Sequence, residues 1–379
     1  MSKKKILITI DWFLPGTKSG GPVRSYANMI AHLASYYDFY IITRDTDYCS
    51  DQPYNSIESN AWNTLSNNTQ VYYISKDQLT KKTLKAVISN ISFDIAYING
   101  IYSWYFSILP LFLLPKSKPV IVAARGMLNP QAFSVKPFKK HVFLFIAKLI
   151  GVYKHVIFHA TNQDEANHIK NRISVNASIR IAPNLPRISR DKNLTKRSKH
   201  EPTRFVCIAR ISVEKGTLKM IRAFKQIKEK AVLDVFGPIY DDSYWTLCKK
   251  ELADLPSNIS INYRGVLPSE EVPEVLTDYD FFVLLSEGEN FGHAILEAFL
   301  SGCPVIISNK TPWKDLENKG VGYDIELSHI KKITTIFDQV IEMSQMEYQK
   351  QSLNAFNFSK TFVNDPKLLQ ANLDLFELK

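Results

Sequence analysis

The stretch SEGENFGHAILEAFLSG, residues 286–302, decides the fold class because it joins two apolar runs of strand length. DFFVLL ends immediately before it, and CPVIIS begins immediately after it at Cys303. The chain must cross over between these runs, and a helix that begins soon after Gly292 and ends by Gly302 accounts for the crossover. Strand, helix and strand in this order predict a parallel α/β sheet.

The same alternation extends through most of the chain. The strand-like runs of the first half are KKILITI, DFYIIT, VYYI, FDIAYING, PVIVAAR, VIFHAT and IRIAPN. After residue 203 the pattern restarts with RFVCIAR, AVLDVFG and ISINYRG, which precede the two runs above. We therefore predict an α/β protein with two Rossmann-like domains, each a parallel sheet with helices on both faces.

The polar segment PRISRDKNLTKRSKHEPT separates the two patterns and is predicted as a linker. The final third after the last strand has a helical pattern that ends with a helix near Pro366 to Glu377. The predicted domain boundaries are 1–186 for the N-terminal domain, 187–203 for the linker, 204–355 for the C-terminal domain and 356–379 for a C-terminal helix that packs back on the N-terminal domain.

Composition favours a globular enzyme in a reducing compartment. Of 379 residues, 45% are hydrophobic and 22% are charged, and the four cysteines show no paired spacing that would suggest disulfides or a zinc site. The start MSKKKILITIDWF is interpreted as a first buried strand and not as a signal peptide, and no apolar run approaches the roughly 20 residues of a membrane span. We expect a cytoplasmic protein, with peripheral attachment to the inner membrane face as a further possibility.

The charge is unevenly distributed along the chain. Residues 1–200 contain 27 Lys or Arg and 11 Asp or Glu, whereas the remainder contains 20 and 26. A basic half suits phosphates or an anionic membrane surface, and no known nucleic-acid module is present. Lysines alternate with apolar residues in Phe133–Phe158, which is either a core-facing helix with a solvated basic side or an amphipathic surface that contacts anionic lipid.

Residues 286–302 have the chemistry of a ligand site. Glu287, Glu289 and Asn290 are expected at the carboxyl end of a strand, the edge where open α/β sheets bind ligands. Gly292 permits a ligand to approach the backbone, and Glu297 lies about one turn into the helix. The alternative, that the glutamates only stabilise the helix N-terminus by about 0.3–1 kcal/mol each, explains neither Gly292 nor Glu297. Two carboxylates beside a helix N-terminus suit a sugar nucleotide.

Two cations follow another predicted strand, in the stretch ARISVEKG. Arg210 and Lys215 at a strand's carboxyl end can bind a diphosphate and stabilise the charge of a departing nucleotide. The alternative is that both are solvated charges of an ordinary loop.

Glu289-Asn290-Phe291-Gly292, followed by Glu297, resembles the E-x7-E signature of the retaining glycosyltransferases of family four. The continuation EAFLSGCPVIIS is similar to the same family's sequence after that signature. The resemblance implies the GT-B fold, in which two Rossmann-like domains face each other across a cleft. It also implies that a sugar passes from a nucleotide donor to an acceptor hydroxyl with retention of anomeric configuration.

The resemblance implies a role for each matching residue. In this family, the residues corresponding to Arg210 and Lys215 stabilise the diphosphate, Glu289 orients the sugar and Glu297 holds the ribose. PGTKSGGPVRSYANMI resembles the family's glycine-rich loop, although an ordinary helix-entry turn is the alternative. The residues expected to bind the donor are Gly20, Gly21, Gly237, Val266, Leu267, Asn290, Phe291, Gly292 and Glu297, with the backbone of Val266 and Leu267 at the base edge.

One departure from the family concerns the loop after the fifth strand. Many members have a histidine there, whereas this sequence has Arg125 in VAARGMLNP. An arginine cannot act as a base near neutral pH, but it can bind a phosphate or a sugar oxygen, and we include Arg125 among the candidate catalytic residues. The Asp45-Thr46-Asp47 sequence resembles the metal-binding pair of the GT-A fold, but it follows the second strand of a GT-B-type domain, so we expect neither a metal nor a cofactor.

The resemblance thus implies a hexosyl-transferring enzyme with a UDP- or GDP-linked donor. The expected acceptor is a lipid-linked glycan or oligosaccharide in bacterial surface-polysaccharide biosynthesis, such as O-antigen (lipopolysaccharide) or capsule. Two alternatives are a nucleotide-sugar epimerase on the same fold and a non-catalytic subunit that binds sugar nucleotides.

Overall fold

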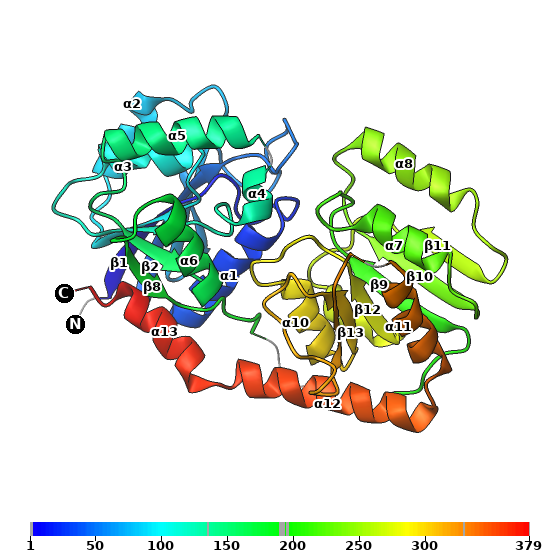
Figure 1. Ribbon diagram of the computed structural model, residues 1–379. Helices are drawn as coiled ribbons and strands as arrows, with labels where there is room; N and C mark the ends of the chain where they lie inside the picture. The colour runs from blue at the N-terminus through cyan, green and yellow to red at the C-terminus, as the bar shows by residue number, and fades with distance from the viewer. Residues whose placement is uncertain (1–2, 135, 189–193, 195–196, 329, 379) are drawn as a thin grey trace. The chain divides into compact units, whose positions relative to one another are not determined.

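The computed structural model describes residues 3–134, 136–188, 194, 197–328 and 330–378, and the chain divides into two compact units (Figure 1). Unit 1 comprises residues 1–188 and 365–379, and unit 2 comprises residues 189–364. The predicted linker lies in part outside the described residues. Residues 187 and 188 belong to unit 1, whereas the linker from residue 197 onward is bound to unit 2, because Arg197 Nη1 donates to the Ser301 carbonyl over 2.7 Å and the Lys199 amide donates to Gln345 Oε1 over 2.9 Å.

Unit 1 is built on an eight-stranded sheet with the order β3-β4-β2-β1-β5-β6-β7-β8. The strands are β1 (Lys4–Thr9), β2 (Tyr37–Arg44), β3 (Trp62–Ser66), β4 (Thr69–Ile74), β5 (Ile95–Asn99), β6 (Val120–Ala123), β7 (Ile157–Ala160) and β8 (Ser178–Ile181). All neighbours pair in parallel except β3, which pairs antiparallel with β4 and was not predicted. Its sequence WNTLS is mostly exposed and has no apolar alternation, so it lacks the pattern of a half-buried strand.

Helices cover both faces of this sheet. They are α1 (Gly21–Leu33), α2 (Lys81–Ser89), the π-helix η1 (Trp104–Ile108), α3 (Leu109–Leu113), α4 (Pro130–Ser134), α5 (Pro137–Leu149), α6 (Gln163–Arg172) and α13 (Pro366–Phe376). One face buries residues from α2, η1, α3 and α6 in a single apolar cluster. On the other face, the rings of Tyr26 from α1 and Phe376 from α13 pack against Tyr97, with centroids 5.2 and 5.5 Å away.

Unit 2 is built on a six-stranded parallel sheet with the order β11-β10-β9-β12-β13-β14. The strands are β9 (Thr203–Ile208), β10 (Ala231–Phe236), β11 (Ile259–Tyr263), β12 (Phe281–Leu284), β13 (Val305–Ser308) and β14 (Gly322–Ile325). Renumbered within the unit, this is the 3-2-1-4-5-6 order of a dinucleotide-binding fold. The strand order reverses between β9 and β12, and in such sheets ligands bind outside the carboxyl ends of the strands at that point.

The helices of unit 2 connect these strands. They are α7 (Thr217–Phe224), α8 (Asp242–Leu252), α9 (Val272–Val275), the 3-10 helix η2 (Leu276–Asp278), α10 (His293–Leu300), α11 (Ile330–Glu342) and α12 (Gln345–Val363). The bounds of α10 confirm the crossover predicted between Gly292 and Gly302. Both glycines have positive φ, +80° and +63°, so a residue with a side chain would be strained at either end of this helix.

Candidate active site

Two loops meet at the point where the strand order of unit 2 reverses. One follows β9 and contains Arg210 and Lys215, and the other follows β12 and contains Glu287 and Glu289. The backbone joins them, because the Glu287 amide donates to the Glu214 carbonyl over 2.8 Å. The sheet order therefore brings together two charged stretches that lie more than 70 residues apart in the sequence.

The contact at the centre of these loops is an ion pair between two residues predicted for the site. Lys215 Nζ lies 2.5 Å from Glu289 Oε1, and the two side chains are only 19% and 11% exposed. A charge-assisted hydrogen bond in such a sheltered place fixes both groups in position. An ammonium can donate three hydrogen bonds, so Lys215 can contact Glu289 and an incoming anion at the same time.

Arg210 lies on the first loop but pairs with a different carboxylate. Its Nη2 atom is 3.4 Å from Glu214 Oε2, and the side chains are 40% and 47% exposed. An exposed pair at this distance contributes little to stability, so the guanidinium can exchange Glu214 for a ligand at small cost.

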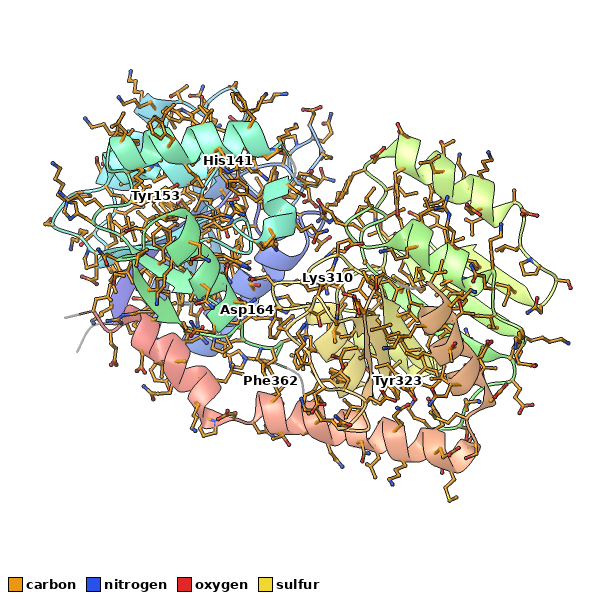
Figure 2. The ribbon with its side chains drawn as sticks, in the orientation of Figure 1. His141, Tyr153, Asp164, Lys310, Tyr323 and Phe362 are labelled. Carbon is orange, nitrogen blue, oxygen red and sulfur yellow. The ribbon has the colours of Figure 1, made fainter. Side chains whose placement is uncertain are left out.

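Glu287 occupies a cluster that sequence reasoning missed. Lys219 Nζ and Lys310 Nζ lie 2.7 and 2.5 Å from its two carboxylate oxygens (Figure 2 labels Lys310). Although burial raises the pKa of the Glu287 carboxyl, the hydrogen bonds from the two lysines hold that pKa below its usual value overall. Lys219 lies in the first turn of α7, whereas Lys215 precedes that helix, so no helical spacing in the sequence connects the two lysines. No pattern pointed to Lys310.

The loop from Glu287 to Gly292 is fixed by the segment after β13. The Glu289 amide donates to the Lys310 carbonyl over 3.1 Å, and Trp313 Nε1 donates to the Phe291 carbonyl over 2.6 Å. The Phe291 ring is buried between Trp313 and Phe362, with centroids 5.7 and 6.0 Å away. Phe291 is thus a packing residue that sets the backbone on which Glu289 is carried.

The N-terminus of α10 follows directly on this loop. Asn290 is half-buried beside Phe291, and Glu297 is half-buried one turn into α10. Gly292 is the N-cap of α10, and no side chain caps this end, so its backbone N–H groups are suited to an anion.

Gly237, Val266 and Leu267 lie on the loops that follow β10 and β11, next to the loop after β9. A Cβ atom at Gly237 would lie 1.8 Å from the Ala209 carbonyl oxygen, so only glycine permits this close approach. The Gly237 amide donates to the Gly265 carbonyl over 2.8 Å, which ties the two loops together. Val266 is exposed, whereas Leu267 is half-buried against the core.

In unit 1, Gly20 and Gly21 lie at the start of α1, and Gly20 has a φ of +79°. The loop before them is held by Asp47, whose Oδ2 atom accepts hydrogen bonds from the amides of Thr17 and Lys18 over 3.0 and 3.2 Å. Asp45 is buried and accepts a hydrogen bond from Ser59 Oγ over 2.8 Å. Asp47 thus braces the glycine-rich loop, whereas Asp45 fixes the segment around Ser59.

Arg125 is held inside unit 1 at the end of β6. Its Nη1 and Nη2 atoms donate to Asn184 Oδ1 over 2.6 Å and to Tyr97 Oη over 2.9 Å. The guanidinium also lies over the Tyr26 ring, 4.6 Å from its centroid. Gly126 donates its amide to Glu165 Oε1 over 2.6 Å, which places a buried carboxylate near the cation.

Over the parts of the chain that the structure describes, no cluster of three or more His, Cys, Asp or Glu side chains could hold a metal ion. Within the same residues, no helix is both long and apolar enough to cross a membrane.

Two α/β units built on parallel sheets match the architecture of GT-B glycosyltransferase structures. Residues 189–356 match the family model described as glycosyl transferases group 1, and this match identifies the protein as a glycosyltransferase that takes its sugar from a nucleotide sugar. An uncharacterized 41.2 kDa protein in the cps region of Klebsiella pneumoniae is 20% identical over 260 residues, which are 65% of this chain and 69% of that protein.

Solved structures share the fold over nearly the whole chain. Anabaena HepE in complex with UDP-glucose has a TM-score of 0.70 and 15% identity, with 98% of each chain covered. WaaG, a glycosyltransferase involved in lipopolysaccharide biosynthesis, has a TM-score of 0.65 and 12% identity, also with 98% of each chain covered.

Proposed function

We propose that this glycosyltransferase transfers a hexosyl group with retention of configuration from a UDP- or GDP-linked donor to the hydroxyl of a lipid-linked glycan. The observation that carries the proposal is the sheltered pair of Lys215 and Glu289 at the strand-order reversal of unit 2. The UDP-glucose complex of HepE, which has the same fold, supports a uridine nucleotide sugar as the first donor to test.

In the proposed mechanism, unit 2 binds the donor. The diphosphate draws hydrogen bonds from Lys215 and replaces Glu214 as the partner of Arg210, so both cations neutralise the charge that grows on the leaving nucleotide. Glu289, held in place by Lys215, accepts hydrogen bonds from sugar hydroxyls, and Glu297 accepts them from the ribose.

The remaining donor contacts are proposed for the neighbouring loops. The amides at Gly292 meet the diphosphate at the α10 N-terminus, and the backbone of Val266 and Leu267 meets the edge of the base. Asn290 and Phe291 shape the loop that carries Glu289. Gly237 allows the loop after β10 to lie close to the Ala209 carbonyl in the loop after β9.

The chemical step requires no protein nucleophile. The acceptor oxygen forms a bond to the anomeric carbon while the bond from that carbon to the phosphate oxygen breaks, and the acceptor proton passes to the departing phosphate on the same face. The protein contributes orientation and charge stabilisation.

Unit 1 is proposed to bind the acceptor, with the Gly21 N–H offered to an acceptor phosphate, while the Gly20 N–H donates to the Thr17 carbonyl over 3.2 Å and fixes the turn before α1. For Arg125 we propose that it holds the loop after β6 through Tyr97 and Asn184, besides any contact with a sugar or phosphate oxygen. The relative in a cps region and the fold of WaaG support an acceptor used in surface-polysaccharide assembly, at the inner face of the cytoplasmic membrane.

The test offers a panel of UDP- and GDP-sugars to the full chain and measures thermal shift and donor hydrolysis. We expect one donor to raise the melting temperature, and we expect Lys215→Met and Glu289→Gln to reduce its turnover by about 100-fold each. Lys225→Met is the matched control, because Lys225 forms a 3.0 Å pair with Glu251 elsewhere in unit 2 and should leave turnover unchanged.

Three results would contradict the proposal. Conversion of the donor into another nucleotide sugar without any acceptor would identify an epimerase. Donor binding without turnover, unaffected by Glu289→Gln, would identify a non-catalytic subunit. An equal loss of turnover in the Lys225 control would show that the effect of the site variants is not specific.

A further inference from the structure

Helix α5 of unit 1 exposes a row of large apolar side chains. Phe138, Phe145 and Leu149 are 79%, 70% and 75% exposed, and Val142 between them is 41% exposed. Figure 1 shows α5 as a long helix at the outside of unit 1, and His141 marks it in Figure 2. Exposing apolar side chains to water costs free energy in proportion to their apolar area. A row of four such side chains on one helix therefore indicates a binding surface.

The spacing places these four residues on one face of the helix. Positions 138, 142, 145 and 149 are separated by four, three and four residues, which is the period of a single helical stripe. The inner face attaches α5 to unit 1 through buried Ala147 and through Phe143, whose ring contacts Tyr102 at 5.4 Å. The helix is therefore apolar on two opposite faces, and packing within unit 1 explains only one of them.

The charged side chains of α5 are all lysines. Residues 95–163 contain eight Lys or Arg and no Asp or Glu. Lys139 and Lys148 are exposed and lie about 90° to either side of the stripe, at about 100° per residue. Lys140 faces inward, where its Nζ atom lies 5.5 Å from the centre of the Tyr102 ring. The apolar row thus has a lysine on each flank.

We propose that this stripe docks on a bilayer that contains anionic lipid, with Phe138, Phe145 and Leu149 in the interfacial layer and the two lysines at lipid phosphates. A helix that lies in the interface has this combination of an apolar face and flanking cations. A protein partner is less suited, because a stable interface takes about 20–30 residues a side, whereas the stripe is four residues on one convex helix.

Docking through this stripe would bring the enzyme to the membrane surface where a lipid-linked acceptor lies. The importance of the docking for catalysis therefore rests on the proposed function. The docking itself needs neither donor nor acceptor. It also decides between the two interpretations of Phe133–Phe158: the inner face of α5 packs on the core, and the outer face is assigned to lipid.

The experiment measures co-sedimentation of the full chain, without substrates, with phosphatidylcholine vesicles that contain or lack phosphatidylglycerol. At low salt we expect binding only to the anionic vesicles. The double variant Phe138→Ser/Phe145→Ser should weaken binding by about 100-fold, from roughly tenfold per lost ring. Lys139→Gln/Lys148→Gln should weaken it by about 25-fold and reduce its dependence on salt.

Two controls remove exposed side chains of the same chemical kind elsewhere. Val175→Ser removes another 79% exposed apolar residue of unit 1, and Lys249→Gln/Lys250→Gln removes two exposed lysines of α8 in unit 2; both should bind vesicles like the unmodified chain. Circular dichroism melting of every variant separates loss of docking from loss of folding.

Two outcomes would overturn the proposal: no binding to anionic vesicles at low salt, or binding by the phenylalanine variant at the level of its control. Self-association that disappears in the phenylalanine variant, without vesicle binding, would instead identify a protein interface. Donor hydrolysis is measured in parallel with the same proteins. If the unmodified chain hydrolyses the donor but does not bind vesicles, only the docking proposal is refuted. If the unmodified chain hydrolyses no donor, the proposed function is refuted.

Discussion

Arg125, Tyr97 and His159 form a buried chain of hydrogen bonds in which each proton can be placed. Arg125 Nη2 donates to Tyr97 Oη over 2.9 Å, so the hydroxyl is free to donate to His159 Nδ1 over 2.5 Å. His159 Nε2 then carries the other proton and donates it to the Ala182 carbonyl over 2.7 Å. The imidazole is therefore neutral, and burial together with the Arg125 charge lowers its pKa to about 3.

This neutral histidine makes the stability of unit 1 depend on pH. Because the folded pKa lies below the ordinary value of about 6.5, the unfolded state takes up the proton first as the pH falls. The stabilisation is complete above about pH 6.5 and is lost towards pH 3, with about 2 kcal/mol lost at pH 5. Urea unfolding should show a smaller difference between pH 7 and pH 5 for His159→Gln than for the unmodified chain. Equal differences would show that His159 does not titrate in this way.

At the scale of residues, the sequence predicted the centre of the site better than its surroundings. Glu289 and Lys215 could be placed together because each follows a strand that ends at the same edge of the sheet. The partners of Glu287 could not, since Lys310 follows a different strand and a lysine after a strand has many uses. The bonds of Arg125 to Tyr97 and Asn184 depend on the registry of strands far apart in the sequence, which one sequence does not encode locally.

At the scale of elements, the loop before α10 depends on the segment after β13. Trp313 Nε1 donates to the buried Phe291 carbonyl over 2.6 Å, while its ring packs against Phe291 and Phe299 at 5.7 and 5.6 Å. The loop therefore has a fixed backbone before any ligand binds.

Trp313→Phe tests this dependence, because the substitution keeps an aromatic ring and removes the Nε1–H that donates to the Phe291 carbonyl. The unpaired Phe291 carbonyl should lower the stability of unit 2 by about 1–3 kcal/mol, and the loosened loop should raise the donor KM more than it changes kcat. Steady-state kinetics and thermal melting measure both effects. Trp62→Phe on the exposed strand β3 of unit 1 is the control and should change neither. A fall in stability with an unchanged KM would limit Trp313 to packing.

The elements that the sequence missed share a physical reason. Helix α10 was predicted because an apolar pattern lay between Gly292 and Gly302 and joined two strand-like runs, and in the structure both glycines have positive φ. The strands β3 and β14 lie at sheet edges, and each has only four or five residues. The edge strands β8 and β11 are equally short but were predicted, because SIRI and ISINY each contain two isoleucines, whereas WNTLS and GYDI each contain one β-branched residue.

At the scale of the whole molecule, the chain completes unit 1 with its last residues. Helix α13 belongs to unit 1 although it follows all of unit 2 in the sequence. Asn372 Nδ2 donates to the Pro183 carbonyl over 2.8 Å, and the fully buried Phe376 ring packs against Tyr37 and Tyr97 with centroids 5.4 and 5.5 Å away. The core of unit 1 is therefore completed by a helix that is separated from the rest of the unit by all of unit 2.

Phe376→Ala should expose this dependence. The cavity left beside Tyr37 and Tyr97 should lower the unfolding free energy of unit 1 by about 3–5 kcal/mol, while unit 2 retains its own core. Hydrogen exchange measured peptide by peptide should show faster exchange in β1, β2 and β5 and unchanged exchange in β9 and β12. Met346→Ala on α12, where the side chain is 78% exposed, is the control. Equal acceleration in both units would mean that they unfold as one cooperative body, and no acceleration would mean that α13 is dispensable for the core of unit 1.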